Sequence, residues 1–287
     1  MINFVLLRLM KLFQAFSYKT LILIPAVAAL AFIHSCTYYI ETMEDSVGDN
    51  YLTDYHYSKM FDQVLDIGNF LYKGETIGTD GPYFKSIDTN GVTKVVSFTY
   101  GDTLRMCYDG VLRAGNGYIT WQGDFFKPGT EISLVFDPFI KGNDWNLKGN
   151  IKITYLDKNE YGQKEYSMET TADIILNKAT LENWTWTNNY TRVKVRGDNT
   201  LTSMDDVWAV WGDVYGRNRK GRFYDATIKD SLYFDNTCEY GIKKGRVDIQ
   251  QVDASERMFV DYGNLDRCDQ WYSFKRGDRN ITITKNK

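Results

Sequence analysis

Short runs of alternating apolar and polar residues dominate the chain from residue 92 onward. In residues 151–155 every second residue is apolar, so Ile151, Ile153 and Tyr155 share one face of an extended strand. About a dozen such runs are separated by turn residues, a spacing typical of antiparallel sheets. The predicted strands are Val95–Tyr100, Tyr118–Gln122, Glu131–Phe136, Asn150–Leu156, Ser167–Leu176, Tyr190–Val195, Val207–Trp211, Arg222–Ile228, Arg246–Val252, Arg257–Tyr262, Gln270–Lys275 and Asn280–Thr284.

Residues 54–73 follow a different period. Apolar side chains recur there every three or four residues, which places them on one stripe of a helix, and Thr53 or Asp54 is suited to cap its start. Residues 74–91 are rich in Gly, Asp and Asn and are predicted to form a loop. We therefore expect an all-β fold over residues 92–287, as an antiparallel multi-stranded sheet or β-sandwich, with one N-terminal helix packed against it. The stripe comprises Tyr57, Met60, Phe61, Val64, Leu65 and Leu71.

The first 35 residues have the layout of a secretory signal peptide. Residues 1–19 carry only positive charge, and residues 20–33 form an uncharged apolar run. That run is shorter than the ~20 residues of a membrane-spanning helix. Apolar residues before Lys19 lengthen it, so an uncleaved signal anchor is the alternative.

The segment ends in Ile33, His34, Ser35 and Cys36, which resemble the bacterial lipobox. Ile33 and Ser35 match its aliphatic and small residues, and His34 departs from it. The resemblance implies that residues 1–35 are removed and that Cys36 carries diacylglycerol and acyl (palmitate) lipid. It also implies a membrane as partner and a cell-envelope location, with the lipid in the outer membrane.

Residues 36–53 are expected to form a tether. Glu41, Glu44, Asp45 and Asp49 lie there without any basic residue. An acidic tether resembles the export signal of Bacteroidetes surface lipoproteins, and a solvated linker is the alternative, so periplasmic and surface-exposed orientations both stay open. The lipobox, tether and helix, with two Tyr-Gly units each followed by a cysteine, make the chain similar to uncharacterised Bacteroidetes-type lipoproteins.

Composition favours an exported β domain over a nucleic-acid-binding one. The chain has 21 Tyr, 16 Phe and 7 Trp but only 4 Pro, a bias that favours half-buried strands over disorder. Removing residues 1–35 takes away three of the 34 basic residues and none of the 37 acidic ones, so the net charge becomes about −6. Nucleic-acid binding usually needs a basic face, so no nucleic-acid partner is expected.

Cys107, Cys238 and Cys268 remain after Cys36. An exported domain is in an oxidising compartment, where a disulfide can persist. A hairpin formed by strands 246–252 and 257–262 brings Cys238 close to Cys268, so this pair is the favoured disulfide. Three reduced cysteines are the alternative.

The sequence contains no catalytic constellation that identifies an enzyme. Ser-His-Asp and Cys-His catalysis need a histidine, and His56 is the only one after the signal. Carboxylate pairs of a glycoside hydrolase remain an alternative, with Asp205 and Asp206 as one candidate pair. A second acidic cluster also supplies the oxygen ligands that a Ca²⁺ site needs. It consists of Asp261, Asp266 and Asp269.

Aromatic side chains form the remaining candidate site. Trp184 and Trp186 share one face of a strand, and Trp208, Trp211 and Tyr215 follow within a short stretch. Exposed rings would stack on sugars or a partner protein, whereas packed rings would form the core.

The leading interpretation is a non-enzymatic envelope lipoprotein with an interaction, adhesion or structural role toward an envelope protein or polysaccharide. The alternatives are a surface glycan-binding protein and a carboxylate-dependent glycoside hydrolase.

Overall fold

The computed structural model describes residues 18–73, 81–141, 145–176, 183–197, 200, 202–264 and 267–284. The chain divides into two compact units, Met1–Glu44 and Asp45–Lys287. The β-sheet and the residues that contact it belong to the second unit. Within the described ranges, no helix combines the length and hydropathy needed to span a bilayer.

One long helix, α2, spans Tyr18–Lys73. The helix was predicted at residues 54–73, so its presence is confirmed and its predicted start is wrong. Neither Thr53 nor Asp54 caps the start, because both lie within the helix, where the Thr53 hydroxyl donates to the Asp49 carbonyl oxygen at 2.6 Å. The predicted tether of residues 36–53 is therefore helical, and its last part is buried against the sheet rather than solvated.

The described strands pair antiparallel with their sequence neighbours and form one continuous sheet. The all-β class is confirmed, and the multi-stranded sheet is the arrangement observed. Every predicted strand overlaps an observed one, but β1 lies in the predicted loop 74–91. Its mostly exposed side chains do not alternate in burial, so the pattern did not reveal it. The strands are β1 Tyr83–Asp88, β2 Thr93–Met106, β3 Leu112–Gln122, β4 Glu131–Lys141, β5 Trp145–Lys158, β6 Lys164–Leu176, β7 Asn183–Arg196, β8 Val207–Arg217, β9 Phe223–Asp235, β10 Ile242–Gln251, β11 Met258–Asp261, β12 Trp271–Arg276 and β13 Arg279–Thr284.

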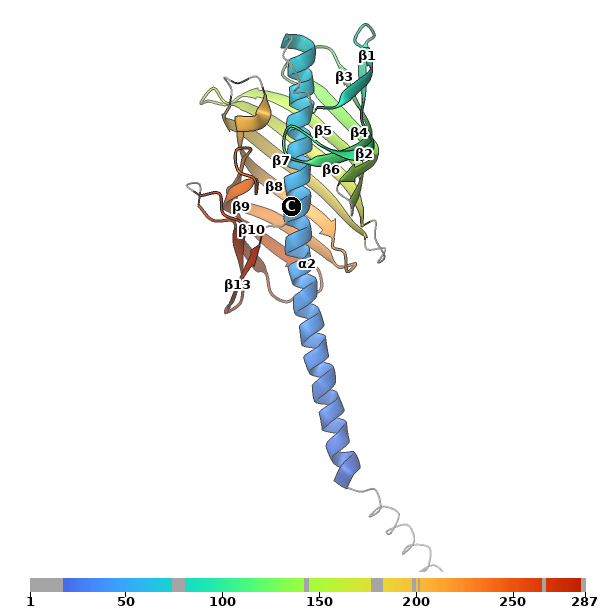
Figure 1. The fold of residues 1–287 in the computed structure, drawn as a ribbon. Helices are drawn as coiled ribbons and strands as arrows, with labels where there is room; N and C mark the ends of the chain where they lie inside the picture. The colour runs from blue at the N-terminus through green and yellow to red at the C-terminus, as the bar shows by residue number, and fades with distance from the viewer. Residues whose placement is uncertain are drawn as a thin grey trace, which may run out of the picture. The chain divides into compact units, whose positions relative to one another are not determined.

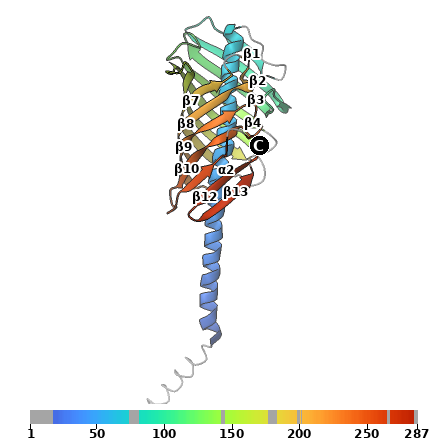
Figure 2. The ribbon, with the colours of Figure 1, turned by 90° about the vertical axis from the view of Figure 1, so that its left-hand side faces the viewer.

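The sheet curves around the part of α2 that belongs to the second unit (Figure 1, Figure 2). β-Bulges contribute to this curvature, because each bends its strand and increases the twist. Gly101, Gly212 and Gly245 lie at shifts of strand register and have φ angles of +91°, +136° and +123°. A Cβ atom at Gly212 would collide with the carbonyl oxygen of Asn189, so this close approach requires glycine.

The concave face of the sheet and the helix form the core. On β7, the side chains of Trp184, Trp186, Asn188 and Tyr190 are buried, and those between them are more exposed. Residues 46–67 of α2 are buried on all sides of the helix except at Gly48. The predicted apolar stripe is therefore only part of the contact, because the polar faces of the helix are covered as well.

Cys238 and Cys268 form a disulfide, as predicted, with their Cα atoms 5.4 Å apart. Cys238 lies in the turn between β9 and β10, and β10 pairs with β11 as the predicted hairpin required. The bridge therefore holds the β9–β10 turn against the segment before β12. Cys107 is buried and reduced.

Replacing Cys238 and Cys268 together by alanine is expected to lower the free energy of unfolding by about 3–4 kcal/mol, because the bridge closes a loop with a sequence separation of 30 residues. Urea unfolding measures this loss. Added reductant should destabilise the unsubstituted protein and leave the double variant unchanged. Equal stability of the oxidised protein and the double variant would contradict this prediction.

Candidate functional site

The contact between α2 and the sheet is a polar network in which the helix mostly accepts and the sheet mostly donates hydrogen bonds. Trp186 Nε1 donates to Asn50 Oδ1 at 3.2 Å, and Tyr190 OH donates to Asp54 Oδ1 at 2.7 Å. Buried polar groups cost free energy unless they are hydrogen-bonded. These sheet donors therefore allow a helix with many polar residues to lie in the interior.

Three of the predicted binding tryptophans belong to this interior. Trp184, Trp186 and Trp208 are each at most 1% exposed. Trp184 Nε1 donates to Thr53 Oγ1 at 3.1 Å, and the Trp208 ring packs edge-on against Phe61 at 5.1 Å between centroids. The prediction that these three rings form a glycan- or partner-binding surface is wrong, because all three rings are buried in the core, where they contact α2.

Trp211 and Tyr215 of β8 are the exposed rings of that predicted group, at 37% and 51%. Tyr215 stacks on Phe223 of β9, with centroids 6.0 Å apart. A partner-binding role for Trp211 and Tyr215 stays a prediction.

The basic turn between β8 and β9 attaches the sheet to the helix. Arg219 Nε donates to Asp49 Oδ1 at 2.7 Å, and its backbone N–H donates to Asp49 Oδ2 at 2.9 Å. The guanidinium also lies 5.1 Å from the ring centroid of Trp184. Asp49, which was assigned to an acidic tether, is therefore an internal ion-pair partner with no exposed side-chain surface.

Several helix and loop carboxyl groups are buried with raised pKa values. Burial raises the pKa of Asp54 to about 7, although hydrogen bonds from Tyr190 and Asn50 oppose the shift. Burial also raises the pKa of Asp66 to about 6 and, together with the nearby Asp62 charge, the pKa of Asp206 to about 7.

A buried arginine balances these carboxyl groups. Arg192 Nη2 donates to Ser58 Oγ at 2.8 Å, and its guanidinium lies 4.2 Å from the Phe61 ring centroid. Burial lowers the pKa of Arg192 to about 10, and the negative charge of Asp62 limits that decrease. The guanidinium therefore lies among aromatic rings and compensates several carboxylates at a distance.

The carboxylate clusters predicted from sequence have separate local partners. Asp206 pairs with Lys194 at 2.7 Å, whereas Asp205 accepts from Thr200 Oγ1 at 2.6 Å. Asp261 accepts from the backbone N–H of Gly263 at 2.9 Å. Asp266 lies outside the described residues, and none of the residues described makes a group of three or more His, Cys, Asp or Glu side chains able to hold a metal ion. The predicted Ca²⁺ site at Asp261, Asp266 and Asp269 stays a prediction.

A polar cavity of about 220 Å³ lies beside α2. The helix contributes Lys59 and Asp62, which are both buried. Asn236 connects them, because its Oδ1 accepts from Lys59 Nζ at 2.9 Å and its Nδ2 donates to Asp62 Oδ2 at 2.7 Å. The sequence pattern did not single out these residues, since polar positions on a helix are ordinarily solvated. The other lining residues are Tyr108, Asp109, Ser203, Met204, Thr237 and Glu239.

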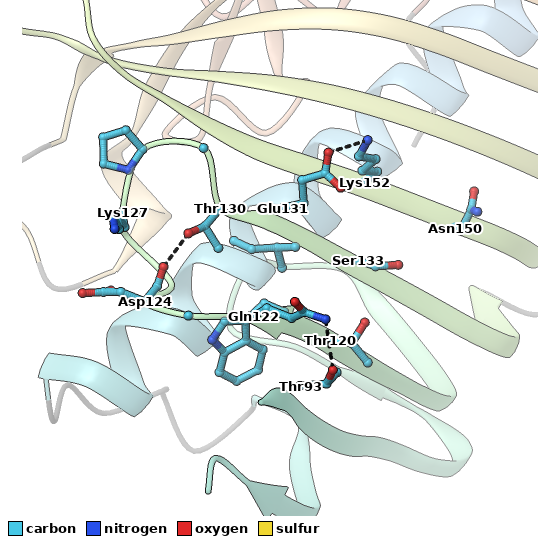
Figure 3. A pocket seen from close by; sticks show the side chains of 15 residues that line it. Thr93, Thr120, Gln122, Asp124, Lys127, Thr130, Glu131, Ser133, Asn150 and Lys152 are labelled. Carbon is cyan, nitrogen blue, oxygen red and sulfur yellow. Dashed lines mark hydrogen bonds and ion pairs between the residues drawn. The ribbon is translucent and has the colours of Figure 1, made fainter. Parts of the chain in front are cut away.

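A larger groove of about 820 Å³ lies on the convex face of β2 to β5 (Figure 3). Most of its lining side chains alternate with core side chains on the same strands, so Gln122 and Asn150 face outward while Ile151 faces the core. Trp121, which is buried, also borders the groove. The turn between β3 and β4 forms one wall. Phe125, which is completely buried, fixes this turn to the core.

The groove is polar and nearly neutral in charge. Glu131 pairs with Lys152 at 2.8 Å, and Asp124 Oδ1 accepts from the backbone N–H of Phe126 at 3.0 Å. Lys127 balances the charge of Asp124. Hydroxyl and amide groups supply the remaining side-chain polarity, from Thr93, Thr120, Gln122, Thr130, Ser133 and Asn150.

In comparisons with family models, curated proteins and solved structures, nothing matches this chain. The structure itself defines the class: an antiparallel meander sheet wrapped around a polar helix, with a neutral groove outside and a small charged cavity beside the helix.

The raised carboxyl pKa values predict that stability falls as the pH rises from about 4 to about 7. In this range Asp54, Asp66 and Asp206 bind protons more tightly in the folded than in the unfolded chain, so unfolding releases protons. The thermal unfolding midpoint should be at least about 3 °C higher at pH 5 than at pH 8.

Asp54→Asn should flatten this dependence, whereas Asp230→Asn, at an exposed ion pair with Arg246, should preserve it. Below about pH 4, Asp109 and Asp235 make stability fall as the pH decreases, because cationic or hydrogen-bonding neighbours lower their pKa values in the folded chain. A midpoint that rises steadily from pH 5 to pH 8 would contradict the assignment.

Proposed function

We propose that this protein is a membrane-anchored cell-envelope lipoprotein that acts by binding, not by catalysis, and that its groove on β2 to β5 binds a neutral polysaccharide. The observation that carries the binding role is the groove of about 820 Å³, formed by consecutive paired strands. Paired strands position side chains rigidly, so little conformational entropy is lost when a ligand binds.

The groove chemistry favours a neutral, hydroxyl-rich occupant. Its acidic and basic side chains balance each other, so a strongly charged partner gains little electrostatic attraction. Thr, Ser, Gln and Asn side chains both donate and accept hydrogen bonds, as sugar hydroxyls do. A polysaccharide segment suits an open groove because neighbouring sugar units extend along the strands. An envelope protein is the alternative partner.

The groove also favours binding over hydrolysis. Hydrolysis of a glycosidic bond generally needs two carboxyl groups flanking the bond. Glu131 is paired with Lys152, and Asp124 accepts a backbone hydrogen bond within its turn. The Asp205–Asp206 pair of the hydrolase alternative lies outside the groove, in the connection between β7 and β8.

Membrane attachment rests on the lipobox-like residues that end at Cys36. Cys36→Ser is expected to abolish incorporation of labelled palmitate and to release the protein from washed membranes. Cys107→Ser, at a cysteine far from the lipobox-like sequence, is the matched control and should keep both properties. Continued tight membrane association of Cys36→Ser without lipid would show an uncleaved signal anchor and contradict lipid anchoring.

Groove binding is tested by removing two outward amides. Gln122→Ala with Asn150→Ala should lower affinity for a neutral polysaccharide by about tenfold, because each lost hydrogen bond contributes about 0.5–1.5 kcal/mol. Affinity electrophoresis in gels containing dextran, mannan, xylan or arabinogalactan measures the change, with full-length protein in lauryldimethylamine oxide. The matched control is Thr187→Ala with Asn189→Ala, on the exposed face of β7.

Retardation by none of the four polysaccharides would refute the proposal for the groove. Equal retardation of the groove double variant and the unsubstituted protein would also refute it. Release of reducing sugar from any of these polysaccharides by the unsubstituted protein would contradict the non-catalytic role.

A further inference from the structure

The cavity beside α2 differs from the rest of the helix–sheet contact because it holds an incompletely paired ammonium group. Lys59 is 6% exposed, and its Nζ donates one hydrogen bond, to Asn236 Oδ1. Among the described ion pairs none includes Lys59. An ammonium group has three protons to donate, so two remain for other acceptors.

A buried carboxylate oxygen in the same lining also lacks a hydrogen-bond partner. Asp62 is 2% exposed; its Oδ2 accepts from Asn236, whereas no described group donates to its Oδ1. Burial raises the pKa of Asp62 and lowers the pKa of Lys59, in keeping with this incomplete hydrogen bonding. The cavity thus presents donor capacity and acceptor capacity that the protein itself leaves unused.

The walls of this cavity are fixed before any ligand enters. Tyr55 OH on the helix donates to the Glu239 carbonyl oxygen at 3.3 Å, and Tyr51 OH donates to the Tyr240 carbonyl oxygen at 2.8 Å. Cys238 lies in the same β9–β10 turn, which its disulfide with Cys268 ties to the segment before β12. On the opposite side, Ser203 is held by Asp66, whose Oδ1 accepts from the Ser203 backbone N–H at 3.0 Å.

The lining carries charges of both signs, so a neutral ligand that both donates and accepts hydrogen bonds complements it. Lys59 opposes entry of a cation, while Asp62 and Glu239 oppose entry of an anion. Asp109 is already bound by both terminal nitrogens of Arg113, at 2.6 Å each. A hydroxyl group accepts from an ammonium and donates to a carboxylate without adding charge, and the Asn236 amide already has this double role between Lys59 and Asp62.

We propose that this cavity binds one neutral, hydroxylated ring, the size of a single sugar residue, through Lys59, Asp62 and Asn236. Its volume of about 220 Å³ exceeds by roughly tenfold the space that one ordered water needs. Tyr108 and Met204 supply apolar surface for the C–H groups of such a ring. The cavity is separate from the groove, with which it shares no lining residue.

Saturation-transfer difference NMR on the full-length protein tests this site. The probes are glucose, galactose, mannose and N-acetylglucosamine, with zwitterionic glycine and anionic inorganic phosphate as comparisons, in the sugar-free detergent lauryldimethylamine oxide. At least one sugar should give a saturable signal, and glycine and phosphate should give none. Saturable binding of glycine or phosphate without any sugar would overturn the proposal, as would the absence of a saturable signal from all six probes.

Two variants test whether the NMR signal comes from sugar bound in the cavity. Lys59→Met keeps the side-chain length without the ammonium and should weaken sugar binding at least tenfold. Met204→Trp, at a half-exposed position in the lining, should block entry and abolish the signal even if Lys59→Met does not fold. Undiminished binding by folded Met204→Trp would overturn the assignment.

The groove variant Gln122→Ala with Asn150→Ala is the matched control and should bind the monosaccharide as the unsubstituted protein does. Loss of the monosaccharide signal in this control would place the sugar in the groove and overturn the cavity assignment. Unchanged polysaccharide retardation of this groove variant, with an intact monosaccharide signal, would instead refute the groove function alone.

Discussion

The structure depends on hydrogen bonds to the polar side chains of a helix that is buried inside a curved β-sheet. Residues 46–67 of α2 include Asp, Asn, Thr, Ser, Lys and Gln side chains that are buried almost completely. Each would destabilise the fold if it lost its water without gaining a protein partner. Tyr, Trp and Arg side chains of the sheet combine an apolar ring or stem with a hydrogen-bond donor. They therefore fill the core and hydrogen-bond to the helix at the same time. Trp184, Trp186 and Tyr190 are the clearest examples.

Curvature makes that pairing geometrically achievable. The antiparallel meander adds each strand beside the previous one, and bulges at Gly101, Gly212 and Gly245 bend the sheet so that donors reach the helix from several directions. Turns complete the enclosure, since Arg219 reaches Asp49 and the disulfide-linked β9–β10 turn reaches Tyr51 and Tyr55. The cavity at Lys59 and Asp62 lies where this pairing is incomplete, so the binding site that we propose coincides with a place where the helix is not fully hydrogen-bonded.

The two faces of the sheet therefore have different chemistry for one physical reason. Strand alternation sends large aromatic rings inward, as at Trp121, and short polar side chains outward, as at Gln122. Trp184, Trp186 and Trp208, which were predicted for a binding surface, are likewise buried in the core. What remains outside on β2 to β5 is a groove of hydroxyl and amide groups, which suits a neutral polar ligand better than an apolar one.

Periodicity in the sequence by itself determined the all-β class, nearly every strand, the existence of the helix and the Cys238–Cys268 pairing, because these follow from local patterns and short hairpins. It missed β1, whose exposed edge-strand residues do not alternate, and it placed the helix start at residue 54. Only the tertiary structure decided that residues 46–53 are buried, because their burial depends on donors such as Trp186 and Arg219, more than a hundred residues away. For the same reason only the tertiary structure brought Lys59, Asp62, Ser203 and Asn236 together. A polar residue on a helix has the same local pattern whether water or a distant strand hydrogen-bonds it.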